Sequence, residues 1–161
     1  MAYKGTSPDV IVVGAGPSGA VLAYELATRG IVVLLVEKCR LPRYKPCAGG
    51  INLRAASLLP FKVDECVEGV VHGARVSYRL GEAITRLYDK PLTYLVTREN
   101  FDYFLALQAR QAGAMLLDGV NVERVWLERD GVRVETSSGT YRGQVVVGAD
   151  GAHSRVARDA G

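Results

Sequence analysis

The sequence predicts an α/β fold in which a central parallel sheet carries an antiparallel β-meander as an insertion. Three patterns in the 161 residues support this prediction. Residues 9–29 combine a short β-branched run, a glycine-rich turn and a helical stretch, and residues 31–36 form a second apolar run. Residues 121–143 form short alternating segments separated by turn dipeptides, and an apolar run at 144–147 follows them.

The first predicted unit is a strand, a turn and a helix. Residues 9–13 are apolar and mostly β-branched, as expected for a strand that is buried on both faces. The helix is predicted over 17–29, because Pro17 suits a first helical position and Gly30 suits a stop. Residues 31–36 are predicted as the next buried strand.

The middle of the chain is less regular. Residues 38–50 are predicted as a loop rich in proline, glycine and basic residues, and residues 51–96 as a short helix near 53–59 with two or three strands between 69 and 95. Thr97 is placed to cap a helix over 98–112, which Gly113 ends.

Turn dipeptides define the last part of the sequence. Asp130-Gly131 and Ser138-Gly139 stand where the turns of a three-stranded meander are expected. Gln144 to Val147 is predicted to return as a buried strand that runs into Gly148-Ala149-Asp150-Gly151. These βαβ units around an antiparallel insertion indicate a Rossmann-type fold, with no obvious internal domain boundary.

Composition excludes several classes of function. The 20 Lys and Arg residues are spread among 17 Asp and Glu residues, which argues against nucleic acid as a partner. The three cysteines have no CxxC spacing, so we predict no disulfide framework, no metal site and a cytoplasmic location. The apolar stretch 10–27 contains glycines and Glu25, which fits neither a signal peptide nor a membrane span.

The glycine-rich turn predicts a dinucleotide site. In Gly14-Ala15-Gly16-Pro17-Ser18-Gly19 the first glycine permits a tight turn, the second lets the backbone approach a pyrophosphate, and the third lets helix and strand pack closely. Glu37, 23 positions after Gly14 and followed by Lys38, is placed to accept hydrogen bonds from ribose hydroxyls. A glycine-rich turn that binds nothing is the alternative.

Two further segments resemble signatures of a flavoprotein superfamily. Thr97-Arg98-Glu99-Asn100-Phe101-Asp102 and the segment from Gly148 to Val156 are similar to motifs of the aromatic hydroxylases, flavin halogenases and geranylgeranyl reductases. The resemblance implies a Rossmann-type FAD-binding fold. It also implies that Arg98 contacts the pyrophosphate or ribityl region, that Asp150 and Gly151 lie near the pyrophosphate, and that the backbone at Val122 passes the adenine. Taken alone, Arg98 would be a solvated residue of a first helical turn.

The loop from Pro42 to Gly50 narrows the resemblance. Lys45-Pro46-Cys47-Ala48-Gly49-Gly50 is similar to the Lys-Pro-Cys-Gly-Gly segment of the geranylgeranyl reductase family, from which it departs at Ala48. The resemblance implies that Ala48, Gly49 and Gly50 approach the flavin and that Cys47 faces the active site. A lone cysteine is more commonly a small buried hydrophobe. The neighbouring Arg43 and Lys45 are placed to lower the pKa of Cys47 or to hold an anionic head group, unless they are solvated.

The expected function follows from this resemblance. We expect one FAD-binding domain over 1–161 with an interleaved substrate segment at 51–96, and an oxidoreductase that reduces isoprenoid double bonds by hydride transfer from reduced FAD. NAD(P)H or another reductant would supply electrons, and a prenyl substrate implies transient contact with a membrane surface. Because family members continue further, the chain is interpreted as an N-terminal part, incomplete at its C-terminus. The alternatives are a flavin monooxygenase or halogenase, and a non-catalytic nucleotide-binding module.

Overall fold

The buried strand β1 (Val10–Val13) organises the central sheet. In the computed structural model, which describes residues 7–161, β1 pairs in parallel with β2 (Val33–Glu37) and with β12 (Val145–Gly148). Strand β8 (Met115–Asp118) pairs with β2 and completes the order β12-β1-β2-β8. The predicted parallel sheet of a Rossmann-type fold is therefore confirmed; the first six residues of the predicted domain lie outside the described residues.

The chain divides into two compact units. One contains the described residues up to 43 together with 102–161, and the other contains residues 44–101. Helix α3 (Arg98–Gln111) begins in the second unit and continues in the first.

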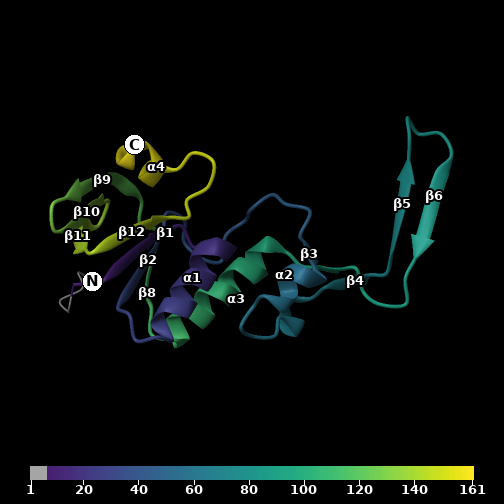
Figure 1. Cartoon of the computed structure of the whole chain (residues 1–161), viewed down its shortest axis with the longest axis horizontal. Coiled ribbons are helices and arrows are strands. Elements are labelled where there is room, and N and C mark those ends of the chain that lie inside the picture. Colours follow the sequence, from purple (N-terminus) through teal and green to yellow (C-terminus); the bar gives the residue numbers. More distant parts are fainter. Residues whose placement is uncertain (1–6) are drawn as a thin grey trace. The chain divides into compact units, whose positions relative to one another are not determined.

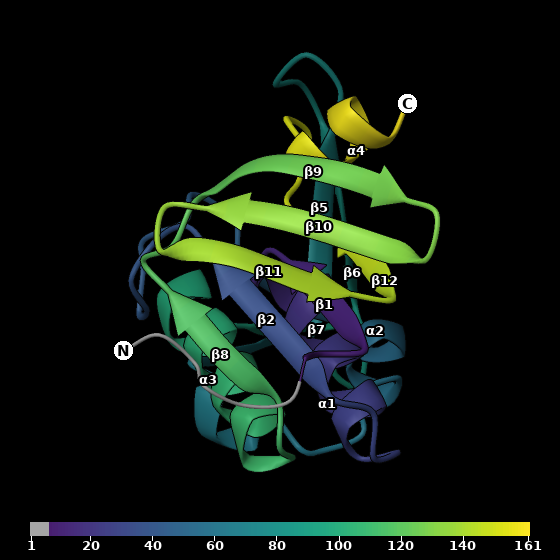
Figure 2. The same ribbon diagram turned by 90° about the vertical axis from the view of Figure 1, so that its left-hand side faces the viewer.

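The first unit is layered. Helix α1 (Pro17–Ala27) and α3 lie on one face of the parallel sheet (Figures 1 and 2). The other face carries the three-stranded antiparallel sheet β11-β10-β9, and Figure 2 shows these strands lying across the central sheet. The bounds of these strands are Val122–Glu128 for β9, Gly131–Thr136 for β10 and Gly139–Gly143 for β11. After β12 the chain ends in helix α4 (Arg155–Ala160).

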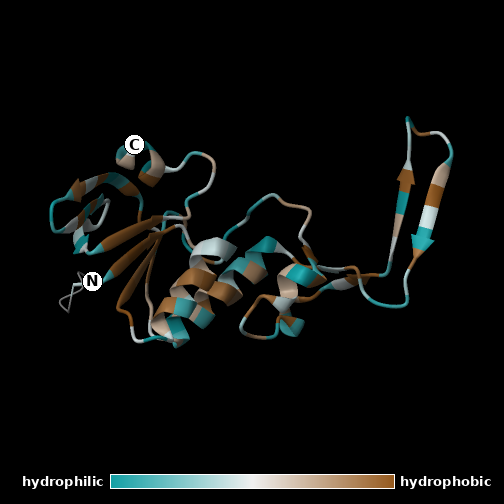
Figure 3. Cartoon of the chain, viewed as in Figure 1, coloured by the Kyte–Doolittle hydropathy of each residue, from teal (hydrophilic) through white to brown (hydrophobic). Residues whose placement is uncertain are grey.

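Strand alternation builds the core of this unit. One face of the central sheet packs against the valines of β9 and β10. The side chains on this face come from alternate positions of β1 and β2: Ile11, Val13, Leu34 and Val36. Figure 3 shows β1 and β2 as almost continuously hydrophobic strands. Such strands belong between two covering layers, which here are the helices and the meander.

The second unit is built around a small sheet and a hairpin. The sheet has the order β3-β7-β4, with bounds Gly50–Asn52, Thr93–Leu95 and Gly69–Val71. Helix α2 (Leu53–Ser57) and a 3-10 turn (Asp64–Cys66) lie between β3 and β4 in sequence. Strands β5 (Gly73–Ser77) and β6 (Ala83–Leu87) pair with each other as an antiparallel hairpin.

The structure departs from the sequence prediction at two strands of the central sheet. The prediction had no strand between Gly113 and residue 121, where β8 lies, because its Met-Leu-Leu-Asp sequence lacks the β-branched residues typical of strands. Residues 144–147 were predicted as a buried strand, but β12 is an edge strand whose Val145 is half exposed. Among residues 7–161, no helix combines the length and apolar character needed to cross a membrane.

Candidate functional site

The glycine-rich turn between β1 and α1 is tightly held. Gly14 has a φ of +100° and donates its N–H to Val36 O at 2.7 Å, so the chain turns sharply at the end of β1. A Cβ on Gly19 would lie 1.9 Å from the carbonyl oxygen of Gly14. The close helix–strand packing predicted for Gly19 therefore rests on a contact that any other residue would block.

A distant segment closes this turn from the other side. Ala149 donates its N–H to Val13 O at 2.8 Å, and its carbonyl oxygen would lie 2.4 Å from a Cβ on Gly14. Ala149 was not among the residues predicted for the site. Its small side chain between Gly148 and Asp150 was the available signal, but its partner Gly14 lies 135 positions earlier in the sequence.

The N-terminus of α1 is a suitable place for an anion. Gly16 caps the helix in an extended conformation without a side-chain hydrogen bond, and Pro17 stands at the first position. The first turn contains no acidic residue, so the free N–H groups of Ser18 and Gly19 and the positive end of the helix dipole are not offset there. Phosphate groups bind at such termini.

Glu37 lies at the end of β2 and contacts the same turn. Its Oε2 accepts the Ala15 N–H at 2.9 Å, and its Oε1 accepts the Cys39 N–H at 3.1 Å. The carboxylate is therefore fixed at the carboxyl end of the sheet, where nucleotides bind in open α/β folds. Oε2 retains a lone pair with which to accept a further hydrogen bond.

Arg43 joins this carboxylate to helix α3. Its Nε lies 3.5 Å from Glu37 Oε1, and its Nη1 lies 3.1 Å from Oδ2 of Asp102, whose side chain is fully buried. Nη1 is itself buried and makes no hydrogen bond of good geometry. Arg43 thus forms a buried charge network. The sequence analysis had considered it as a group that lowers the pKa of Cys47, as a group that holds an anionic head group, or as a solvated loop charge.

The remaining residues predicted in this unit have identifiable local surroundings. The Asp150 carboxylate accepts the Ser154 hydroxyl and the Arg155 N–H, both at 2.6 Å, at the start of α4, whose N-cap is Ser154. Gly151 follows with a φ of +82°. Val122 packs its side chain into the core at the start of β9, and Lys38 is exposed directly after Glu37.

A second group of predicted residues gathers in the other unit. Cys47 is exposed, and its pKa is lowered, first by a hydrogen bond from the Gly49 backbone and then by the Arg98 side chain. The neighbour that acts on Cys47 is therefore Arg98, which stands 51 positions later in the sequence. Ala48 and Gly50 flank these residues and are exposed.

Gly49 has a structural reason to be glycine. Its φ is +70°, its carbonyl accepts the Val96 N–H at 2.9 Å, and a Cβ there would lie 2.0 Å from Val96 O. The close approach at this glycine is therefore to the backbone beside β7. Directly before α3, the Thr97 hydroxyl donates to Glu68 Oε1 at 2.8 Å.

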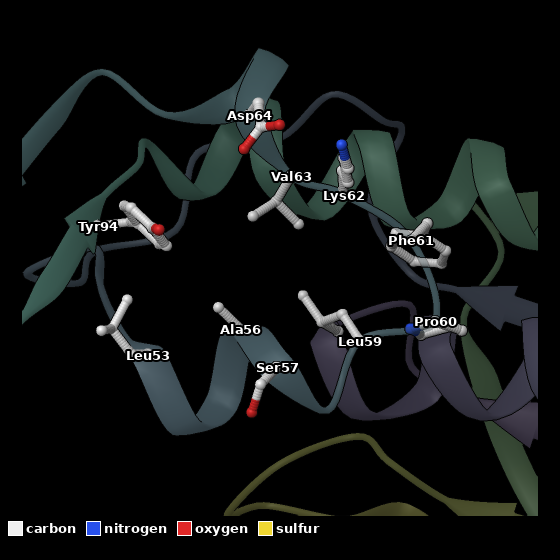
Figure 4. A pocket seen from close by; sticks show the side chains of 10 residues that line it. All are labelled: Leu53, Ala56, Ser57, Leu59, Pro60, Phe61, Lys62, Val63, Asp64 and Tyr94. Carbon is white, nitrogen blue, oxygen red and sulfur yellow. The ribbon is translucent and has the colours of Figure 1, made fainter. Parts of the chain in front are cut away.

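The same unit contains an open hollow of about 610 Å³. Figure 4 shows Leu53, Ala56 and Leu59 facing Val63 across it, with Tyr94 at one end. Lys62 and Asp64 bring charged groups to this largely apolar lining. The hollow falls within the predicted substrate segment, residues 51–96.

The first unit meets the chemical requirements of a dinucleotide. Backbone N–H groups at a helix start suit a pyrophosphate, and a fixed carboxylate at the end of the adjacent strand suits ribose hydroxyls. Arg43 Nε, 3.5 Å from Glu37 Oε1, places a positive charge beside that carboxylate. These groups come from separate segments that the fold brings together at one sheet edge.

Known proteins resemble this chain in sequence and in fold. The chain is 36% identical over 161 aligned residues to the digeranylgeranylglycerophospholipid reductase of Methanocaldococcus jannaschii, an alignment that covers 95% of this chain and 40% of that protein. It superimposes on a geranylgeranyl bacteriochlorophyll reductase-like protein of Thermoplasma acidophilum with a TM-score of 0.85 at 27% identity, covering 96% of this chain and 42% of that one.

The fold is also shared with a more distant flavoprotein. A crystal structure of a variant of the halogenase PltM in complex with FAD matches with a TM-score of 0.81 at 22% identity, covering 95% of this chain and 36% of the halogenase. This likeness concerns the fold alone. The chain spans about two fifths of the length of the curated relatives that it matches.

A family model described as an FAD binding domain matches residues 7–161. The match includes both predicted nucleotide segments, the turn at Gly14 and the segment at Asp150. FAD is thus the cofactor, as the resemblance implied, and the chain belongs to the FAD-binding domain family.

Proposed function

We propose that the whole protein is an FAD-dependent oxidoreductase of the geranylgeranyl reductase type, which reduces isoprenoid carbon–carbon double bonds. The observation that carries this proposal is the 36% identity, across 95% of the chain, to a digeranylgeranylglycerophospholipid reductase. The loop from Lys45 to Gly50, whose sequence resembles that family, supports the same reading. The likeness to the halogenase does not compete with it, because that likeness concerns the fold alone.

The residues of the first unit would hold the cofactor. The Ser18 and Gly19 N–H groups would bind the pyrophosphate, with Asp150 and Gly151 beside it, and Glu37 would accept hydrogen bonds from ribose hydroxyls. The predicted adenine contact at the backbone of Val122 is supported by the neighbouring segment, since Val120 donates its N–H to Glu37 O at 2.9 Å. Bound FAD supplies hydride-transfer chemistry, and NAD(P)H or another reductant would supply the electrons.

Cys47 is proposed to donate a proton to the substrate. Reduction of a double bond requires a proton at one carbon as well as a hydride at the other. A thiol whose pKa is lowered is a stronger acid, so the Gly49 backbone and Arg98 make the sulfur of Cys47 a better proton donor than an ordinary cysteine. Cys47 is exposed, and its proton can be replaced from solvent.

The interleaved segment 51–96 is proposed to contact the isoprenoid. The apolar side chains that line its hollow, Leu53, Ala56, Leu59 and Val63, offer the kind of surface on which a prenyl chain packs. Replacing Ala56 with Trp should lower turnover of a geranylgeranyl substrate while leaving FAD affinity unchanged. If the Ala56→Trp protein turned the substrate over as fast as the parent, the hollow would not be a binding site for the isoprenoid chain.

Anaerobic turnover tests the proposed reaction. The protein expressed from its complete reading frame is supplied with a geranylgeranyl lipid and dithionite-reduced flavin without oxygen, and products are followed by mass spectrometry. Products heavier by two hydrogens per double bond are expected, and Cys47→Ser should slow their formation more than it changes FAD binding. Activity that requires oxygen and yields a hydroxylated or halogenated product would overturn the proposal.

A further inference from the structure

Strands β3 and β7 belong to two segments of the chain that run side by side in opposite directions. The two strands pair in antiparallel register over their full lengths. The next pair in the same register is joined by a backbone hydrogen bond of 2.9 Å from the Val96 N–H to the Gly49 carbonyl. Two positions further along each segment, the Arg98 side chain acts on Cys47. The register of the small sheet therefore brings Cys47 and Arg98 together.

An ion pair joins the same two segments further on. Arg43 stands four positions before Cys47. Its Nη1 lies 3.1 Å from Oδ2 of Asp102, which stands four positions after Arg98. Asp102 and Arg98 are one helical turn apart on α3, so they share a face of that helix. Cys47 is thus held between two fixed points, the hydrogen bond at Gly49 and the ion pair at Arg43.

Burial suits this ion pair to fixing a position. The Asp102 side chain is fully buried and the Arg43 side chain is 13% exposed. Replacing a buried ion pair by apolar residues of similar volume is often neutral for stability, because both charges lose hydration, whereas the ion pair accepts few geometries. The Arg43 guanidinium also places Nε 3.5 Å from Glu37 Oε1, and the single ammonium of a lysine cannot span two carboxylates in this way. The pair therefore specifies geometry more than it adds stability.

We propose that Arg43 and Asp102 are positioning residues for Cys47, which hold it beside the first turn of α3 for proton delivery to the substrate. The connections between the two compact units leave the first unit at Arg43 and at Asp102, so the ion pair ties both connections together. Arg43 acts through the loop that carries Cys47, and Asp102 acts through the helical turn that begins at Arg98. The inference deepens the proposed function and rests on it for the role of Cys47.

Alkylation of Cys47 by iodoacetamide tests the positioning. The protein expressed from its complete reading frame is treated over a range of pH, and the Cys47 peptide is followed by mass spectrometry, which separates it from the other cysteines. Asp102→Asn keeps the size of the side chain and removes its charge. Because Cys47 then loses its fixed place beside Arg98 and the Gly49 backbone, the pKa of its thiol should rise and the alkylation profile should move to higher pH.

Steady-state turnover gives a second measurement. Asp102→Asn should lower kcat for double-bond reduction by about a hundredfold, the scale of a misplaced catalytic group, while KM and the Kd of FAD stay near the parental values. Arg43→Lys keeps the positive charge but cannot reach both carboxylates, so the same changes of alkylation and kcat are expected. Arg133→Lys is the matched control, because Arg133 binds Glu128 Oε1 at 2.7 Å in the meander; it should behave as the parent does.

The outcomes separate position from stability and from the reaction. Thermal unfolding of each variant sets a temperature at which it is folded. If Asp102→Asn and Arg43→Lys lower the melting temperature but keep the parental alkylation profile, the pair only stabilises the fold and the proposal is overturned. It is also overturned if neither variant folds, or if the profile shifts while kcat is unchanged. A parent without isoprenoid turnover would refute the proposed reaction, whereas the alkylation profiles would still decide whether the pair positions Cys47.

Discussion

Replacing Arg43 with Met should destabilise the folded chain strongly. The guanidinium lies between Glu37 and Asp102, and its side chain is only 13% exposed. Methionine keeps much of the apolar stem but leaves two buried carboxylates without their cation. Removing one partner of a buried ion pair costs about 3–5 kcal/mol. The lower end of that range applies, because Nη1 contacts Asp102 without good hydrogen-bond geometry.

Urea unfolding followed by circular dichroism measures the effect. With a slope near 2 kcal/mol per molar urea, a loss of about 3 kcal/mol lowers the midpoint by roughly 1.5 M. The same substitution at Arg29, whose ion pair with Glu25 is on the surface, should cost no more than about 1 kcal/mol. Adding Asp102→Asn to Arg43→Met should recover part of the loss. An Arg43→Met chain within about 1 kcal/mol of the parent would refute the buried network.

Three further substitutions test the candidate site. Glu37→Gln should weaken FAD by about 1–3 kcal/mol, measured by flavin fluorescence titration, and an unchanged Kd would exclude the ribose role. Gly14→Ala should destabilise the chain by more than Gly30→Ala in thermal melts, since both have positive φ but only Gly14 meets a neighbouring carbonyl; equal losses would disprove that contact. Because the pKa of Cys47 is lowered, iodoacetamide should alkylate it at lower pH in the parent than in Arg98→Met. Superimposable pH profiles would contradict the Arg98 contribution.

Local patterns predicted most of the first unit. The run from β1 through α1 to β2 and the turns at Gly131 and Gly139 follow from side-chain periodicity and turn residues, which act over a few positions. Strand β8 was missed because leucine and methionine suit a helix as well as a strand. The edge position of β12 depends on which strands flank it, and periodicity within one strand cannot report that.

Sequence patterns could name candidate residues for the site, but they could not give the contacts among those residues. The spacing of Gly14 and Glu37 predicted that they serve one nucleotide, and the hydrogen bond from Ala15 to Glu37 shows them at one place. The contact between Ala149 and Gly14 and the action of Arg98 on Cys47 join residues far apart in sequence. Because only the tertiary fold brings such residues into contact, these contacts could not be predicted from the spacing of residues in the sequence.

The pairing of β1 with β12 has a consequence for how the protein is made. Val10 and Val145 are register partners, 135 positions apart, and Ala149 closes the turn at Gly14. A ribosome therefore releases the glycine-rich turn long before the residues that complete it. During that interval β1 has one free edge, and contacts of such long sequence separation form slowly. The nucleotide pocket is thus completed only after residue 149 has emerged, and the nascent chain can capture its cofactor only from that point.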